Sequence, residues 1–327
     1  MTSTARVMRY ARAGGPEVLA METVALPDPG PGEVQIRQQA VGLNYMDVYF
    51  RSGFYPAPTP AGVGTEAAGV VEKVGSGVTE FKPGDRVAYA SGAPGSYADL
   101  RNMPADRVIA IPDGVPVDEA AALLMKGMTA EYLLTRCYPL KAGEFALFYA
   151  ASGGVGLIAG QWGRHLGARM IGVASGAEKC ARAKENGYEV VIDRSREDVL
   201  ARVKEITGGA GVPVVYDSIG KATFDTSIKC LAPRGYFVSF GTTTGAPPPV
   251  EAGLLQKSGS LYFTRPTLAT YCSARPDMLA SAAKLFDLYR AGAIKANIGK
   301  RYALADAAEA HRDLEAGRTV GASLLIP

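Results

Sequence analysis

The sequence predicts an α/β protein in which an antiparallel β domain precedes a doubly wound parallel sheet. Its 327 residues suit two domains, since one domain usually takes roughly 100–200 residues. The first 125 or so residues contain short strand patterns separated by glycine and proline turns. From residue 144 onward, strand patterns alternate with helical ones, which is typical of a parallel sheet.

In the first domain, residues 34–38 alternate apolar and polar side chains, as a half-buried strand does. Residues 69–75 and 85–89 are further strand candidates, bounded by turns of glycine and proline. A segment rich in Ala, Leu and Met, residues 118–134, is expected to form the helix that carries the chain out of this domain. The run at 322–327 has strand character and is expected to rejoin it.

The second domain is expected to contain six strands, at residues 145–149, 169–174, 190–193, 212–217, 236–240 and 261–264. Helices are expected in it up to residue 166 and at residues 178–186 and 198–207, and a long helix is expected after it at residues 278–291. We expect residues 127–267 to form this domain, and residues 1–126 and 268–327 to form the other.

Composition and charge exclude several classes of protein. The net charge of +3 and the absence of a run of Lys and Arg argue against a nucleic-acid partner. Residues 1–15 lack the apolar core of a secretory signal, and the most apolar stretch, 145–160, is too short to span a bilayer. The four cysteines lie far apart without C-x-x-C spacing, which favours free thiols in a reducing cytoplasm.

A glycine-rich turn follows the first strand of the second domain and reads Ala151-Ser-Gly-Gly-Val-Gly156. In a dinucleotide site, a small residue makes the tight turn, Gly153 lets the backbone meet the pyrophosphate, and Gly156 lets helix and strand pack closely. The position between a strand and a helix is the context that this motif requires. We therefore predict cofactor contacts from Ser152, Gly153, Gly154, Val155 and Gly156; the alternative is a turn that serves packing alone.

The end of the second strand indicates which cofactor binds. An NAD site places an acid there for the ribose 2′-hydroxyl, but this chain has Ala174 and Ser175. Ser175 can donate to a phosphate, Lys179 follows one helical turn later, and Arg194 lies at the same sheet edge with a guanidinium suited to phosphate. The sequence therefore predicts NADPH. The alternative is that Lys179 and Arg194 are ordinary solvated charges.

Over nearly its whole length the chain resembles the zinc-independent, ζ-crystallin-like quinone oxidoreductases of the medium-chain dehydrogenase/reductase superfamily. The resemblance rests on the turn at Ala151 and on Gly14-Gly-Pro-Glu-Val-Leu19, Gly42-Leu-Asn-Tyr-Met-Asp47, Arg51-Ser-Gly, Gly64-Thr-Glu66, Lys126-Gly-Met-Thr129, Val214-Val-Tyr-Asp-Ser218, Val238-Ser-Phe-Gly241 and Thr264-Arg-Pro266. It implies a GroES-like catalytic domain, a Rossmann cofactor domain, a C-terminal segment that returns to the first domain, and a homodimer joined through the cofactor domains.

The resemblance also implies that zinc is absent. The zinc alcohol dehydrogenases of this superfamily have Cys where this chain has Asn44 and His where it has Thr65, and neither replacement is a usual zinc ligand. Glu66 and Asp47 remain, but two carboxylates alone make a poor zinc site. A quinone is already electron-poor, so holding it beside the nicotinamide can replace polarisation by a metal.

By the same resemblance, Asn44, Asp47, Tyr49 and Tyr55 are expected to line the nicotinamide and substrate cleft. Asn44 can bond a ribose or substrate oxygen, and each tyrosine offers a phenol and a flat apolar face; the alternative for the tyrosines is packing. Further cofactor contacts are expected from Lys126 and Thr129 at the start of the connecting helix, from Ser218, Phe240 and Gly241 at strand ends, and from Arg318. The two histidines, His165 and His311, are expected to be structural.

The leading functional hypothesis is NADPH-dependent reduction of a small-molecule quinone by a cytoplasmic homodimer. One alternative is reduction of the double bond of an enone or alkenal, since sister families share the scaffold. Another is a non-enzymatic nucleotide- or RNA-binding protein, which lacks support because no basic stripe with interleaved aromatics is visible.

Overall fold

The computed structural model describes residues 3–90 and 92–327 and divides the chain into two compact units. The first unit contains the residues up to Lys126 together with Ala296–Pro327, and the second contains Gly127–Lys295. The chain leaves the first unit within α2 (Val117–Tyr132), which a π-helical turn, Leu133–Cys137, extends.

The chain returns to the first unit at residue 296, not at residue 268 as expected from the sequence. The reason is that α9 (Arg275–Arg290) is anchored within the second unit. Ser281 Oγ and Lys284 Nζ, both on α9, donate to the buried Glu131 carboxylate at 2.9 and 3.0 Å. These bonds hold the long helix to the end of α2.

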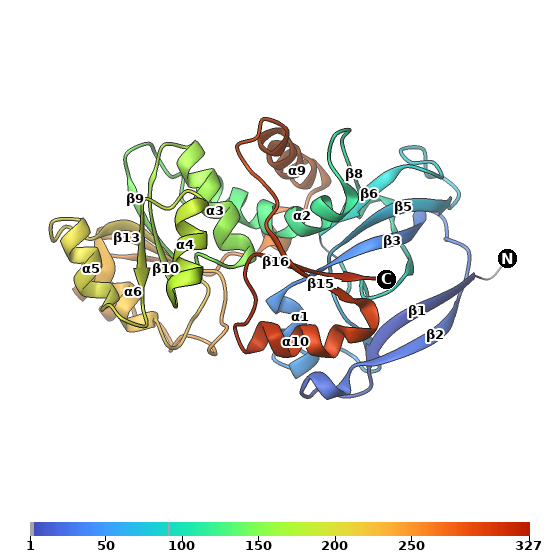
Figure 1. The fold of residues 1–327 in the computed structure, drawn as a ribbon, viewed down its shortest axis with the longest axis horizontal. Helices are drawn as coiled ribbons and strands as arrows, with labels where there is room; N and C mark the ends of the chain where they lie inside the picture. The colour runs from blue at the N-terminus through green and yellow to red at the C-terminus, as the bar shows by residue number, and fades with distance from the viewer. Residues whose placement is uncertain (1–2, 91) are drawn as a thin grey trace. The chain divides into compact units, whose positions relative to one another are not determined.

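The first unit is mainly antiparallel. Its strands are β1 (Ser3–Tyr10), β2 (Ala20–Leu26), β3 (Glu33–Leu43), β4 (Ala61–Gly62), β5 (Ala67–Val74), β6 (Arg86–Tyr89), β7 (Leu100–Pro104), β8 (Ile109–Ala110), β15 (Ile298–Ala303) and β16 (Ala322–Ile326). One sheet has the order β2-β1-β4; the other has the order β15-β16-β3-β5-β6-β8, with β7 also on β3. Figure 1 shows β1 beside β2. The last strand, β16, is antiparallel to β3, so the chain end rejoins this unit as predicted.

Strand β3 is more deeply buried than its sequence suggested. Alternation predicted a half-buried strand at residues 34–38, yet Gln35 and Gln38 are both buried. The Gln35 amide donates to Asn102 Oδ1 at 2.9 Å, and the Gln38 amide donates to the Ser96 carbonyl at 2.9 Å. These bonds satisfy the amide nitrogens of both side chains, as a buried donor requires.

The described part of the first unit also contains the beginning of α2, the helices α1 (Tyr45–Ser52) and α10 (Ala307–Glu315), and the 3₁₀ turns Pro16–Val18, Ala105–Arg107 and Leu304–Asp306. Arg51 on α1 is only 1% exposed, and both of its terminal nitrogens donate to the Glu315 carboxylate of α10, at 2.9 and 2.6 Å. This bidentate ion pair fixes α1 against α10 and so orients the residues at the start of α1.

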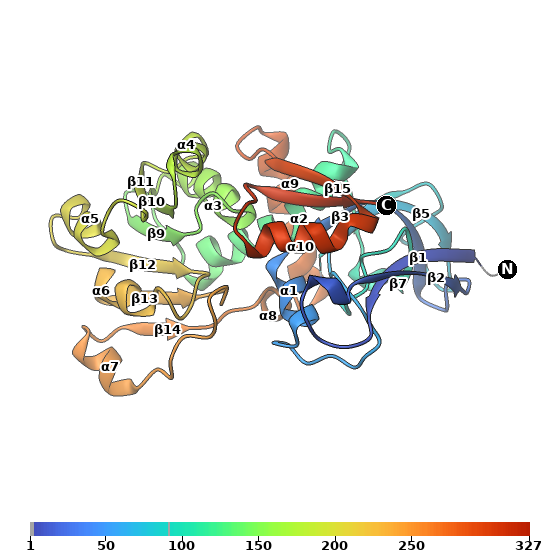
Figure 2. The ribbon, with the colours of Figure 1, turned by 60° about the horizontal axis from the view of Figure 1, so that its bottom comes forward.

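The second unit is a doubly wound α/β fold. Its strands are β9 (Phe145–Tyr149), β10 (Arg169–Ala174), β11 (Val190–Asp193), β12 (Val212–Asp217), β13 (Leu231–Ser239) and β14 (Tyr262–Thr264). They are all parallel, in the order β11-β10-β9-β12-β13-β14, which is the strand order of dinucleotide-binding folds (Figure 2).

The helices of the second unit are, besides α9, α3 (Gly154–His165), α4 (Ala177–Glu185), α5 (Val199–Ile206), α6 (Phe224–Cys230), α7 (Ala252–Lys257) and α8 (Leu268–Tyr271). The predicted limits of β9 to β12 agree with the structure, because each strand is a short apolar run ended by a turn. Branched and aromatic side chains such as Leu147, Ile171, Val215 and Phe237 form the core of this unit. Within the described residues, no helix is long and apolar enough to cross a membrane.

Close packing of α3 against the following segment leaves no room for a side chain at Gly160. A Cβ there would lie 2.5 Å from both the Asn186 carbonyl oxygen and the Tyr188 ring. Gly160→Ala is therefore expected to lower the free energy of unfolding by about 1–3 kcal/mol, as overpacking does. Urea unfolding followed by circular dichroism measures this.

The matched control is Gly253→Ala in α7, where a Cβ would meet no atom within 4 Å. It is expected to stabilise by about 0.5–1 kcal/mol, the usual helical preference of Ala over Gly. Equal stability of the two variants would contradict the packing described for Gly160.

Candidate active site

The predicted phosphate turn lies between β9 and α3, as its motif requires. Gly153 is the N-cap of α3, and its N–H donates to the Ala150 carbonyl at 2.9 Å. A Cβ at Gly156 would lie 2.3 Å from that same carbonyl oxygen, so only glycine permits this approach of helix to turn. The first N–H groups of a helix have no partner within it, and together with the helix dipole they favour an anion. Ser152, Gly154 and Val155 complete the turn.

Two of the three residues predicted to select a phosphate, Ser175 and Arg194, meet at the adjacent strand ends. Ser175 follows β10 and Arg194 follows β11, and Arg194 Nε donates to Ser175 Oγ at 2.6 Å. The Arg194 N–H also donates to the Ala174 carbonyl at 3.0 Å, which ties the two loops together. Lys179 lies one turn into α4 and is half-buried.

Ser218, Phe240 and Gly241 also come together, after β12 and β13. A Cβ at Gly241 would lie 2.6 Å from the Ser218 carbonyl oxygen, so glycine allows the two loops to touch. The fully buried Asp217 carboxylate shapes the first of these loops and accepts four hydrogen bonds of 2.7–3.0 Å. Its donors are Ile219 N, Gly220 N, Thr223 Oγ and Ser227 Oγ.

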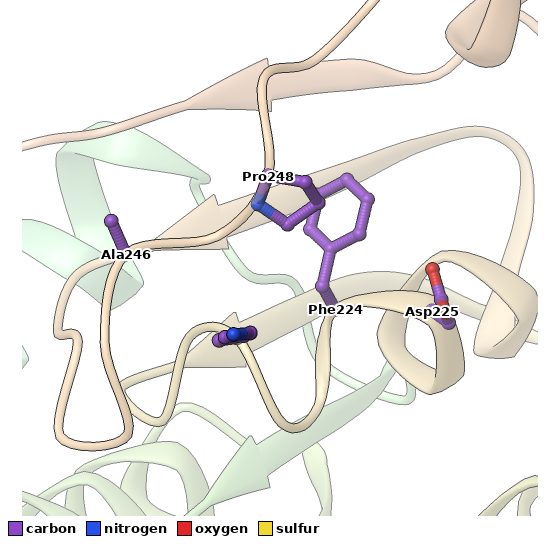
Figure 3. A pocket seen from close by; sticks show the side chains of 5 residues that line it. Phe224, Asp225, Ala246 and Pro248 are labelled. Atoms are coloured by element: carbon purple, nitrogen blue, oxygen red, sulfur yellow. The ribbon is translucent and has the colours of Figure 1, made fainter.

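A pocket lies beyond the same two strands (Figure 3). Lys221, Phe224 and Asp225 line it on one side, and Ala246 and Pro248 on the other. The Phe224 ring points toward Pro248 in this view (Figure 3). None of the residues predicted to bind the cofactor lines this pocket.

In the first unit, Asn44 is the N-cap of α1 and is held by two carboxylates. Its backbone N–H donates to Asp47 Oδ2 at 2.8 Å, and its amide Nδ2 donates to Glu66 Oε2 at 2.9 Å. Glu66 is fully buried and also accepts from Lys126 Nζ at 2.8 Å and from Met125 N at 2.6 Å. The Glu66 carboxylate therefore orients the Asn44 amide, and Lys126 balances its charge.

Asp47 belongs to a second buried group, which the sequence did not reveal. The Tyr97 hydroxyl lies 3.0 Å from Asp47 Oδ2, to which it donates, and 3.0 Å from His311 Nε2. Burial raises the pKa of Asp47 to about 7 and lowers the pKa of His311 to about 3. His311 is thus a neutral core histidine on α10, in keeping with the structural role expected for it.

Tyr49 and Tyr55 lie in an aromatic cluster formed by α1 and the turn that follows it. Their ring centroids are 5.3 Å apart in an edge-to-face arrangement, and Phe54 lies 5.1 Å from Tyr49 and 5.3 Å from Tyr55. Tyr49 is buried, Tyr55 is half-buried and Phe54 is 47% exposed. The exposed and half-buried rings present aromatic surface, whereas the Tyr49 ring is mostly covered by its neighbours in the cluster.

One expectation about position was wrong. Lys126 and Thr129 do not begin the connecting helix, because α2 starts at Val117; they lie in its middle. The Ala-rich first turns carry no turn-forming residue that could have started the helix later. Arg318 forms an ion pair with Asp313 at 2.7 Å in the first unit.

The folds of the two units and the phosphate turn define a two-domain dehydrogenase, and comparison with known proteins agrees. Residues 30–113 match the alcohol dehydrogenase GroES-like domain family, and residues 154–287 match the zinc-binding dehydrogenase family. The predicted fold class, Rossmann plus GroES-like, is confirmed.

Relatives over the full length identify the family. A quinone oxidoreductase of Pseudomonas aeruginosa is 48% identical over 99% of this chain and all of that protein. The crystal structure of the Escherichia coli quinone oxidoreductase complexed with NADPH superposes with a TM-score of 0.97 at 45% identity, covering 99% of this chain and all of the other. A 2-haloacrylate reductase of Burkholderia is 41% identical over 97% of each chain. The chain belongs to the quinone oxidoreductase family of the medium-chain dehydrogenases/reductases.

The zinc that one family name implies does not fit the residues at the corresponding positions. Asn44 and Thr65 offer an amide and a hydroxyl, and the Glu66 carboxylate is already bonded to the Lys126 ammonium, an amide and a backbone N–H. Zinc sites in proteins use thiolate, imidazole or a free carboxylate. Among the described residues, no group of three or more His, Cys, Asp or Glu side chains is placed to hold a metal ion.

The Asp47 and His311 shifts predict opposite dependences of stability on pH. Asp47 has a pKa raised from 3.8 to about 7, so it favours the folded state below pH 4 and loses that contribution as pH rises to 7. His311 has a pKa lowered from 6.5 to about 3, so its contribution is present above pH 6.5 and is lost as pH falls toward 3. Between pH 4 and 6.5 the two trends oppose each other.

Replacing either Asp47 or His311 should reveal the pH dependence of stability that comes from the other. Asp47→Asn is expected to make stability rise with pH between about 4 and 6.5, whereas His311→Gln is expected to make it fall, relative to the unaltered chain. Urea unfolding midpoints at four pH values in this window measure both slopes. Parallel slopes for the two variants would contradict the shifts.

Proposed function

We propose that the chain catalyses NADPH-dependent reduction of quinones without zinc. The observation that carries the proposal is the match, over essentially the whole of both chains, to a quinone oxidoreductase whose structure contains NADPH. The turn at Gly153 and Gly156 and the Ser175–Arg194 pair supply the chemistry that such a cofactor needs.

The second unit would hold the cofactor through groups that the sheet gathers at one edge. The N-terminus of α3, with Ser152 to Gly156, would bind the pyrophosphate. Ser175, Lys179 and Arg194 would bind the 2′-phosphate, because a hydroxyl and two cations replace the acid of an NAD site. Ser218, Phe240 and Gly241 would contact the cofactor further along the edge, and Lys126, Thr129 and Arg318 stay predicted contacts.

The reaction adds two electrons and two protons to the quinone, one proton arriving with the electrons as hydride and the other from solvent. When bound, NADPH supplies the hydride. The Asn44 amide, oriented by Glu66, would bond a ribose or substrate oxygen. Tyr49 and Tyr55, with Phe54 beside them, would supply a flat apolar surface for a ring. Asp47 is fully buried, so we assign it a positioning role toward the Asn44 backbone in place of the catalytic one.

A second candidate is reduction of an activated carbon–carbon double bond. The 2-haloacrylate reductase that shares 41% identity over 97% of this chain favours it. Both reactions place an electron-poor acceptor beside the same hydride donor, so they differ in which acceptor the substrate site accommodates.

We propose further that the enzyme is a cytoplasmic homodimer joined through its Rossmann units. Strand β14 is an edge strand of the parallel sheet, and its Tyr262 is 53% exposed while stacking on Tyr236 with ring centroids 4.5 Å apart. An exposed aromatic on a free strand edge suits pairing with a second copy. The four cysteines are all free, which suits a reducing compartment.

A direct assay tests the activity. Purified protein is expected to oxidise NADPH rapidly with 1,4-benzoquinone and much more slowly with 2-chloroacrylate or an enone of similar size, as followed at the absorbance of NADPH. Rapid oxidation by the alkenes with none by quinones would replace the first candidate with the second.

Cofactor preference tests the phosphate-binding residues. The double variant Lys179→Ala/Arg194→Ala is expected to raise the Michaelis constant for NADPH by about tenfold or more and to leave that for NADH within about twofold, since charge-assisted contacts to the phosphate are lost. The control Arg196→Ala/Lys204→Ala removes two nearby exposed cations and is expected to change neither. Equal effects on both cofactors would refute the assignment.

A further inference from the structure

One carboxylate oxygen bridges the two loops that carry the phosphate-selecting residues. Asp193 is the last residue of β11, and its Oδ1 accepts from Gly176 N at 2.9 Å in the loop after β10. The same oxygen accepts from Ser195 N at 3.0 Å and from Ser195 Oγ at 2.6 Å in its own loop. Three donors on one oxygen hold the two loops in a fixed relation.

The bridged residues flank the phosphate-selecting pair in sequence. Ser175 directly precedes Gly176, and Arg194 lies between Asp193 and Ser195. Arg194 Nε donates to Ser175 Oγ, so this pair is already formed in the chain without a ligand. A guanidinium has four further N–H groups on its terminal nitrogens, which are the groups that a phosphate engages.

Asp193 is itself held in place. Its backbone N–H donates to Glu197 Oε2 at 2.9 Å, and Glu197 forms an ion pair with Arg202 at 2.8 Å on α5. Hydrogen bonds from Ser195 and Gly176 lower the pKa of the Asp193 carboxyl, so it is ionised at neutral pH. A carboxylate at this edge would repel a phosphate if it were turned toward the ligand, but these donors draw it toward the loops.

We propose that Asp193 is the positioning residue that sets the preference for a cofactor 2′-phosphate over a 2′-hydroxyl, by holding the Ser175 and Arg194 loops together. The proposal rests on the proposed function, since it concerns the NADPH site. This role differs from that of the acid in an NAD site. The acid there bonds the ribose directly, whereas Asp193 acts through the backbone of two loops.

The test compares removal of the carboxylate with removal of its charge alone. Isothermal titration of NADPH, NADH and 2′,5′-ADP gives dissociation constants without turnover. Asp193→Ala is expected to weaken NADPH and 2′,5′-ADP about tenfold or more and NADH less than about twofold, because several hydrogen bonds are lost. Asp193→Asn keeps Oδ1 as an acceptor and is expected to bind NADPH within about threefold of the unaltered chain.

The matched control is Asp198→Ala at the N-cap of α5, which removes an acid and the hydrogen bond that its Oδ1 accepts from Ala201 N. It is expected to leave the ratio of NADPH to NADH affinity unchanged. If the Asp193 charge merely repelled the phosphate, Asp193→Ala would bind NADPH more tightly. Tighter or unchanged NADPH binding by this variant would therefore overturn the proposal.

Two further measurements keep the outcomes separate. If Asp193→Ala fails to fold, Ser195→Ala removes only the hydroxyl donor, and it is expected to lower the NADPH preference by about threefold; an unchanged preference overturns the proposal. If the unaltered chain itself prefers neither cofactor, the NADPH part of the proposed function fails instead.

Discussion

Parallel hydrogen bonding among the six strands of the second unit places all their carboxyl ends at one edge, and the cofactor chemistry depends on that edge. Loops that leave parallel strands are flexible unless something bonds their backbone. Here buried or bridged carboxylates do so: Asp217 orders the loop after β12, and Asp193 joins the loops after β10 and β11. In the proposed NADPH site, these acids would shape the loops around a negatively charged ligand, because backbone N–H and hydroxyl groups of the loops occupy the acceptor positions of their carboxylates.

In the interior of the first unit, hydrogen bonds likewise hold buried polar groups in place. Glu66 is fully buried, but it is bonded to a cation and two N–H donors, which makes its burial tolerable. Asp47 and His311 share the Tyr97 hydroxyl, and burial pushes each toward its uncharged form. Asn44 is therefore held from both its backbone and its side chain, which is how a single amide can be rigid at the beginning of a helix.

Much of the architecture follows from local sequence patterns. Apolar runs ended by turns gave the limits of β9 to β12, and Gly156 of the phosphate turn occupies a position where a Cβ would collide with the Ala150 carbonyl oxygen. The Ser175–Arg194 contact also follows, because neighbouring parallel strands end side by side.

Interactions between distant residues left no such pattern. Tyr97 and His311 are 214 residues apart, and nothing near either one indicates the other. The return of the chain at residue 296 was missed for a related reason: the apolar face of α9 shows that the helix packs, but not which unit it packs on. Asp193 could have been predicted, since it is an acid at the end of a strand. It was missed because its hydrogen bonds are to neighbouring loop groups, whereas the sequence pattern indicates only side chains that can face a ligand.

The discontinuous first unit has a consequence for synthesis of the chain. Strand β3 receives its neighbour β16 only from the last residues, and Arg51 receives its partner Glu315 from α10. On a ribosome, where the N-terminal part emerges first, this unit waits with an unpaired strand edge and a cation lacking its partner. The second unit is continuous from Gly127 to Lys295 and is complete before the final strand emerges. Of the two units, the one whose synthesis begins earlier thus receives its last strand only after the other has been made.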